Sequence, residues 1–170
     1  IVALTRRRAS SLDNFAESLA TVCGTQELQS SWAEQLLSIT RRAFSDVGGH
    51  FAGAPACISC LYHSGRHEEL KDLLSLLSFD YWPYSRYEAM GLAAQGKVDE
   101  ALRFAHRFEV QHPYAIAAFC EQLLLDAGRT EEAYRNYGLH TRATNYLTTF
   151  RNLCKRYPQM DKAHILLDLI

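Results

Sequence analysis

One six-residue pattern occurs three times in this chain, as Gly65-Arg66-His67-Glu68-Glu69-Leu70, Gly96-Lys97-Val98-Asp99-Glu100-Ala101 and Gly128-Arg129-Thr130-Glu131-Glu132-Ala133. The copies begin 31 and 32 residues apart. Each copy contains a glycine, a basic residue, two acids and then an apolar residue. Helices commonly end on a left-handed glycine, and acids are favourable in the first turn of the helix that follows. Each copy therefore predicts a corner between two helices.

The period of this pattern predicts the architecture. Helix pairs that recur every 30 to 50 residues or so are typical of stacked α-solenoid repeats. We therefore expect an all-α fold, an α-solenoid of about five antiparallel helix pairs, and we find no strand pattern. The expected helices run from Ser10 or Ser11 to Gly24, from Thr25 to just before Asp46, and then over about 56–64, 67–78, 84–95, 98–111, 114–127, 130–138, 145–157 and 160–169.

The chain divides into three expected parts. Residues 1–50 form an N-terminal capping pair, residues 51–140 form three repeats, and residues 141–170 form a C-terminal pair. The stretch from Gly48 to Pro55, with three glycines and a proline, is the expected hinge after the first part, and Gly138 is expected to close the third repeat. Because the chain starts at Ile1 and ends on apolar residues, we expect a fragment of a longer protein with a truncated last pair.

Two positions after each corner glycine are expected to face the partner helix. The residues five and nine places after the glycine lie one helical turn apart on the same face, as a seam between packed helices requires. They are Leu70 and Leu74, Ala101 and Ala105, and Ala133 and Tyr137.

Composition limits the class of protein. The 170 residues are 48% apolar and 22% charged, which is typical of a folded globular chain. The net charge of −1 argues against non-specific binding of nucleic acid, and no apolar stretch reaches the roughly 18 residues that span a bilayer. Five widely spread cysteines favour a reducing compartment. We expect a cytoplasmic protein with no membrane contact; the oligomeric state stays open.

The corners resemble the tetratricopeptide repeat, over roughly residues 52–140. In that family a glycine turn joins two helices, a small residue begins the packing face of the second helix, and a proline closes the unit. The second repeat matches best, through Gly96, Ala101, Ala105, Phe108 and Pro113. Leu70 replaces the small residue in the first repeat, and Glu121 stands at a usually small position in the third. The resemblance implies a right-handed superhelix.

The C-terminal end resembles the tail of uncharacterised bacterial proteins, some of which carry a SWIM zinc finger. The similar stretches are 132–139, 146–151 and Lys155-Arg156-Tyr157-Pro158. The zinc finger itself is absent, because the chain has no Cys-x-Cys followed by Cys-x-His.

One string of residues has the ligand types of a zinc site: Cys57, Cys60, His63 and His67. The alternative is a buried role, since Cys57 and Cys120 both stand eight residues before a corner glycine and would fill one repeated core position. Burial also argues against a catalytic thiol, which needs an exposed, electropositive setting. We therefore expect no metal, no cofactor and no enzymatic activity.

In the tetratricopeptide family the first helices line a concave groove that receives an extended peptide or a helix. The resemblance places in that groove Ser59, Tyr62, His63, Arg86, Met90, Gln122 and Asp126. The expected function is a non-catalytic scaffold that binds a peptide or helix of a protein partner. The alternative is a docking or spacer segment of a larger nucleic-acid-associated or enzymatic bacterial protein.

Overall fold

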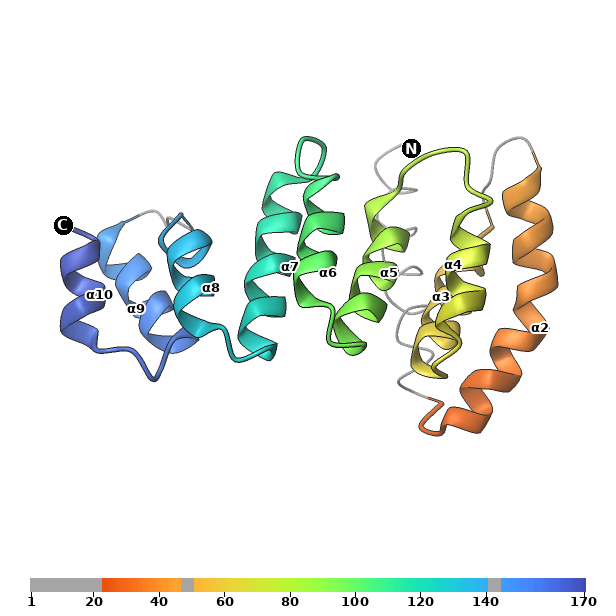
Figure 1. The fold of residues 1–170 in the computed structure, drawn as a ribbon, viewed down its shortest axis with the longest axis horizontal. Coiled ribbons are helices and arrows are strands. Elements are labelled where there is room, and N and C mark those ends of the chain that lie inside the picture. The colour runs from red at the N-terminus through yellow and green to blue at the C-terminus, as the bar shows by residue number, and fades with distance from the viewer. Residues whose placement is uncertain (1–22, 47–50, 141–144) are drawn as a thin grey trace, which may run out of the picture. The chain divides into compact units, whose positions relative to one another are not determined.

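The computed structural model describes residues 23–46, 51–140 and 145–170, and these are helical, with no strand among them (Figure 1). The expected helix before Gly24 lies outside the described residues, as does most of the expected hinge. The elements are α2 (Gln26–Ser45), α3 (Ala54–His63), α4 (His67–Leu74), α5 (Trp82–Ala94), α6 (Val98–His106), α7 (Pro113–Asp126), α8 (Thr130–Asn136), the 3₁₀ helix η1 (Gly138–His140), α9 (Tyr146–Arg156) and α10 (Lys162–Asp168).

The chain forms two compact units, Ile1–Gln95 and Gly96–Ile170. This division falls inside the segment that the sequence assigns to three repeats. In the first unit, α3 packs against α2, α4 and α5. In the second unit, α7 packs against α6 and α8, and α9 packs against α10.

The predicted corners are confirmed by their backbone. Gly65, Gly96 and Gly128 have φ angles of 77°, 79° and 73°, in the left-handed region that favours glycine. In the first and third corners the next amide closes the helix end, because Arg66 N–H donates to Leu61 O at 2.9 Å and Arg129 N–H donates to Leu124 O at 2.8 Å.

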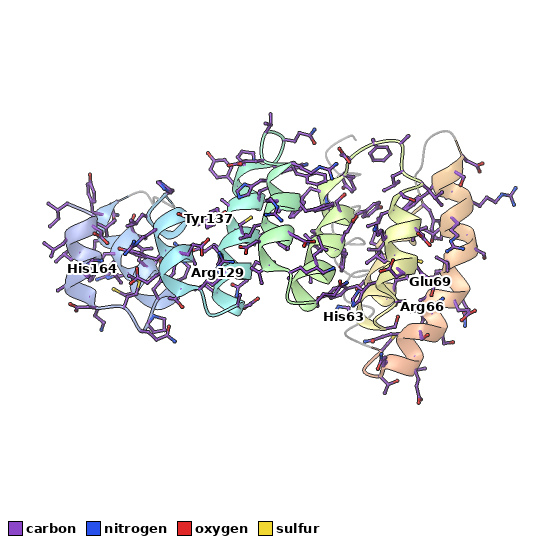
Figure 2. All side chains as sticks on the ribbon, in the orientation of Figure 1. His63, Arg66, Glu69, Arg129, Tyr137 and His164 are labelled. Carbon is purple, nitrogen blue, oxygen red and sulfur yellow. The ribbon has the colours of Figure 1, made fainter. Side chains whose placement is uncertain are left out.

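Two of the corners each contain an Arg–Glu ion pair that the sequence pattern does not predict. Arg66 donates from Nε and Nη2 to the two carboxylate oxygens of Glu69, at 2.6 and 2.7 Å (Figure 2). Arg129 binds Glu132 at the corresponding positions, but through one carboxylate oxygen: Oε2 lies 2.8 Å from Nε and 2.7 Å from Nη2. The acids after each corner glycine therefore interact with the corner arginine as well as with the helix dipole.

Five of the six predicted seam positions are buried. Leu70, Ala101 and Ala133 have 1% or less of their surface exposed, and Leu74 and Ala105 are also buried. Tyr137 is half-buried. Each unit has its own core: in the first it gathers around Ile58, Leu61 and Leu73, and in the second around Leu124, Tyr134 and Leu153.

The second helix of each pair is shorter than predicted. α4 ends at Leu74 rather than 78, and α6 ends at His106 rather than 111. The chain continues beyond both in tighter turns, in which Leu77 N–H donates to Leu74 O and Phe108 N–H donates to Ala105 O. Gly138 does not close the third repeat with a left-handed turn, because it begins the 3₁₀ helix η1.

Across the described ranges, no helix has both the length and the apolar character that crossing a membrane requires.

Candidate partner-binding surfaces

Five of the seven predicted groove residues lie in the first unit, and three of them form one aromatic cluster. The Tyr62 ring lies 5.1 Å from the His63 ring and 5.6 Å from the Tyr87 ring, measured between centroids. The Arg86 guanidinium carbon lies 5.1 Å from the centroid of Tyr87. Met90 packs on the same core, whereas Ser59 is only 1% exposed and lies beneath the surface.

The side chains of this cluster pack mainly against one another. Tyr62 is half-buried, and burial raises the pKa of its phenol, as does the neighbouring Tyr87. The accessible polar group is His63, which is exposed at the end of α3 (Figure 2). The cluster therefore offers a partner a ring edge and an imidazole rather than a broad apolar surface.

The other two predicted residues, Gln122 and Asp126, are exposed on α7 in the second unit. They contact each other, because Gln122 Nε2 donates to Asp126 Oδ1 at 2.8 Å. This is an ordinary (i, i+4) pair on a solvated helix face.

The residues of the zinc-type string are not gathered around a point. Cys57 and Cys60 are fully buried in the first core, and burial raises the pKa of both thiols, that of Cys60 to about 11. His67 instead has its ring against Tyr62 and close to Gly91. Among the residues that the structure describes, no three His, Cys, Asp or Glu side chains are placed to hold a metal ion.

One chain of polar groups has the order of an acid-base relay. His106 Nδ1 lies 3.0 Å from Glu109 Oε2, and His106 Nε2 lies 3.0 Å from the Tyr137 hydroxyl. Burial raises the pKa of that phenol, which opposes the ionisation a nucleophilic tyrosinate would need. His106 and Glu109 are both exposed, so this relay lacks the enclosed setting in which such groups carry out chemistry.

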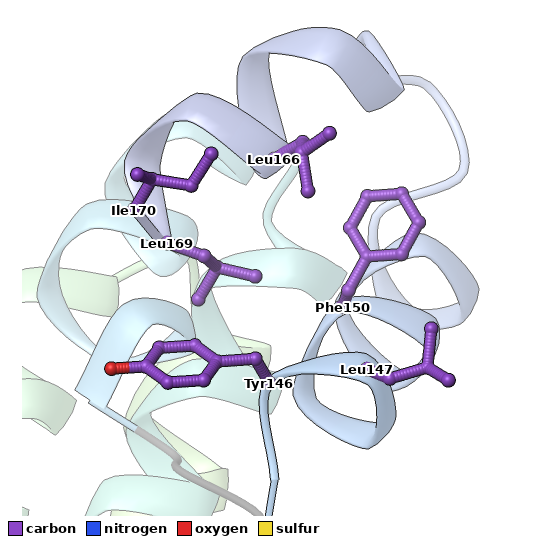
Figure 3. A pocket seen from close by; sticks show the side chains of 6 residues that line it. All are labelled: Tyr146, Leu147, Phe150, Leu166, Leu169 and Ile170. Carbon is purple, nitrogen blue, oxygen red and sulfur yellow. The ribbon is translucent and has the colours of Figure 1, made fainter.

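An apolar cleft lies between the last two helices, α9 and α10. The cleft has a volume of about 390 Å³ and is lined by side chains from the start of α9 and from the end of α10 and the residues that follow it (Figure 3). Its lining is apolar apart from one phenol hydroxyl: Tyr146, Leu147, Phe150, Leu166, Leu169 and Ile170. Four of these side chains are strongly exposed, from 48% for Leu166 to 95% for Ile170. This cleft combines apolar character with open access, which the Tyr62 cluster does not.

The cleft exists because α9 and α10 carry more apolar residues than their inward faces use. Leu153 and Ile165 are fully buried in the second core. Around the helix axis, Leu147 on α9 lies about 120° from Leu153, and Leu166 on α10 lies about 100° from Ile165. Both remain exposed, as does Tyr146 at the start of α9. Sequence reasoning noted the apolar end of the chain but interpreted it only as a sign of truncation. The signal for the cleft was this second, unmatched apolar face.

A buried ion pair attaches α9 to α7. Glu121 is only 6% exposed, and it accepts from Arg156 Nη1 at 2.7 and 2.9 Å. It also accepts a hydrogen bond from the Tyr157 hydroxyl. These partners from the C-terminal stretch account for a carboxylate at a buried position. The α9 wall of the cleft is therefore held to α7.

Comparisons of the chain with protein-family models, with curated proteins and with solved structures found no match. The function is therefore argued from the surfaces themselves.

Proposed function

We propose that this protein is a non-catalytic interaction module of tetratricopeptide-like helix pairs, and that it binds a helix of a protein partner in the cleft between α9 and α10. The observation that carries the proposal is the cleft itself, with its six-residue apolar lining and exposed leucines. Contiguous exposed apolar surface is costly in water and commonly marks an interaction site.

The shape of the cleft favours a helix as the occupant. Two neighbouring helices leave a groove between rows of side chains, and the apolar stripe of a third helix packs into such a groove at positions i, i+3, i+4 and i+7. The lining side chains are aliphatic and aromatic, which suits this packing. They offer few hydrogen-bonding groups for an extended peptide backbone.

The cleft can be tested with a synthetic amphipathic peptide of about 18 residues, long enough to form a helix, with leucine on one face and glutamine elsewhere. We expect saturable binding of the fluorescein-labelled peptide, measured by fluorescence anisotropy. Leu147→Gln and Leu166→Gln should each weaken that binding about tenfold, since each removes a central apolar contact.

The chain supplies a matched control for these variants. Leu167 is 71% exposed on the same helix as Leu166 but does not line the cleft. Leu167→Gln should leave peptide binding unchanged, and the melting temperatures of all three variants should stay close to that of the wild type. If Leu167→Gln weakens binding as much as Leu166→Gln does, or if the peptide does not bind, the cleft is not the interaction site.

A further inference from the structure

The charges around the cleft identify the chemistry of its partner. Resting on the proposed function, we propose that the helix received between α9 and α10 is acidic, with Glu or Asp side chains beside its apolar stripe. The evidence is a set of exposed cations on both walls of the cleft: Arg151, Lys155 and Lys162.

The position of these cations follows from helix geometry. Arg151 stands four residues after Leu147 on α9, and Lys162 stands four residues before Leu166 on α10. Residues four apart are neighbours on a helix surface, so each cation borders a cleft leucine. Lys155 lies one turn beyond Arg151 on the same side of α9. The two walls of the cleft therefore both carry positive charge at the rim.

These cations have no carboxylate partner among the residues that the structure describes. The two acids in residues 145–170 are already engaged. Asp161 accepts from the backbone of Ala163 at the start of α10. Asp168 accepts from the Tyr134 hydroxyl at 2.8 Å and lies 3.4 Å from His164 Nε2. Other cations of the second unit do reach carboxylates, as Arg129, Arg135 and Arg156 show.

Helix stability does not account for Lys162. It lies in the first turn of α10, where a positive charge interacts unfavourably with the helix dipole, and that turn contains no acid. Lys155, by contrast, is in the last turn of α9, where a cation is favourable. Lys162 and Arg151 therefore provide charge at the cleft without an evident intramolecular role.

An acidic helix fits this surface better than an anionic membrane or a nucleic acid. A bilayer accepts protruding apolar side chains, whereas here they line a recess. A nucleic acid would contact the cations but would leave Leu147 and Leu166 exposed to water. A helix with an apolar stripe flanked by acids would cover the apolar lining of the cleft and would also form ion pairs with the cations at its rim.

The proposal is tested with three peptides that share one leucine face and differ only in the flanking residues, which are glutamate, glutamine or lysine. At low salt we expect the glutamate peptide to bind about tenfold more tightly than the glutamine peptide, because two or three surface ion pairs form. This preference should decrease as salt is raised, since exposed charges are screened. The lysine peptide should bind most weakly.

The double variant Arg151→Glu/Lys162→Glu should reverse the order of the glutamate and lysine peptides while leaving the glutamine peptide unchanged. Arg103→Glu is the control, since Arg103 is exposed on α6 of the same unit and exchanges one cation for an anion, as each of the two substitutions in the double variant does. It should leave the order of the three peptides as in the wild type. A melting curve for each variant checks that the fold is retained.

The outcomes separate this inference from the proposed function. If all three peptides bind equally, the acidic partner is ruled out while the cleft remains a helix-binding site. If no peptide binds, both proposals fail. If phosphatidylserine vesicles or a DNA duplex bind at low salt more tightly than the glutamate peptide, and the double variant abolishes that binding, the acidic helix is the wrong partner.

Discussion

Ala101 shows how strongly one side chain depends on the packing of its helix. It is fully buried on α6, five residues after Gly96. We expect Ala101→Asp to lower the free energy of unfolding by at least about 3 kcal/mol, because an unpaired carboxylate would have to be buried or protonated. Chemical denaturation measures this change.

The matched control for that substitution is Ala118→Asp, because Ala118 is exposed on α7. It should change the free energy of unfolding by less than about 0.5 kcal/mol. Equal effects of the two substitutions would contradict the buried position of Ala101.

The five thiols should differ in reactivity. Cys57, Cys60 and Cys120 are fully buried, and burial raises the pKa of Cys60 and of Cys120 to about 11. A thiol with so high a pKa carries much less of the reactive thiolate near neutral pH than an ordinary cysteine does. We expect a thiol reagent to modify Cys23 and Cys154 first, as both are partly exposed, and the other three only on unfolding. Peptide mapping after timed labelling would show this, and a single rate for all five would contradict it.

At the scale of the element, the helix corner is the repeated unit, and its glycines can be tested directly. A Cβ added at Gly96 or Gly128 would meet no atom within 4 Å, so the cost of a side chain there comes from the backbone alone. We expect Gly96→Ala and Gly128→Ala each to cost about 1 to 2 kcal/mol of stability. Gly→Asn at the same positions should cost less, because asparagine tolerates the left-handed region.

Thermal or chemical unfolding measures these differences. Alanine variants as stable as the wild type would show that the corners do not require a left-handed residue.

Much of each corner could be predicted from the sequence because its determinants are local. The glycine, the acids of the next turn and the seam positions lie within nine residues of one another. The ends of α4 at Leu74 and of α6 at His106 were predicted too far along the chain, because a 3₁₀ turn and an α-helical turn accept similar residues.

The candidate site was harder to predict because its determinants are distant. Glu121 meets Arg156 across 35 residues, and sequence periodicity contains no information about such pairing. The cleft depends on which apolar residues of α9 and α10 the core leaves uncovered. The spacing of Arg151 and Lys155 places them one turn apart on a helix, but it does not reveal that they border a cleft, because that depends on α10.

At the scale of the whole molecule, alkaline pH should destabilise the fold. Burial is the largest cause that raises the pKa of Tyr134, Tyr137 and Tyr157. The unfolded chain ionises these phenols above about pH 10, while the folded chain keeps them protonated. Stability should therefore be constant up to about that pH and then decrease as pH rises.

Denaturant unfolding at stepped pH, together with the ultraviolet absorbance of tyrosinate, checks this expectation. Tyr134→Phe should make the loss of stability at alkaline pH smaller. Tyr146→Phe should leave that loss unchanged, because Tyr146 is 73% exposed. Stability that stays flat through the alkaline range would show that the phenols ionise in the folded state.

Charge is distributed unevenly along the chain, which has a net charge of −1. Residues 145–170 hold four basic and two acidic side chains, so the last helix pair is positive within a slightly negative chain. An acidic partner would be attracted to this end at long range and repelled elsewhere, which raises the rate of productive encounters.

Gly138 occupies a position where even the smallest side chain would collide with a neighbouring residue. A methyl group at Gly138 would lie 2.7 Å from the Tyr157 hydroxyl, well inside van der Waals contact. Even alanine would have to displace the phenol that donates to Glu121, and so would loosen the attachment of α9 to α7. One carbon atom added at a position that does not line the cleft would thus misalign the α9 wall, and a loss of peptide binding in such a variant would not mean that position 138 touches the peptide.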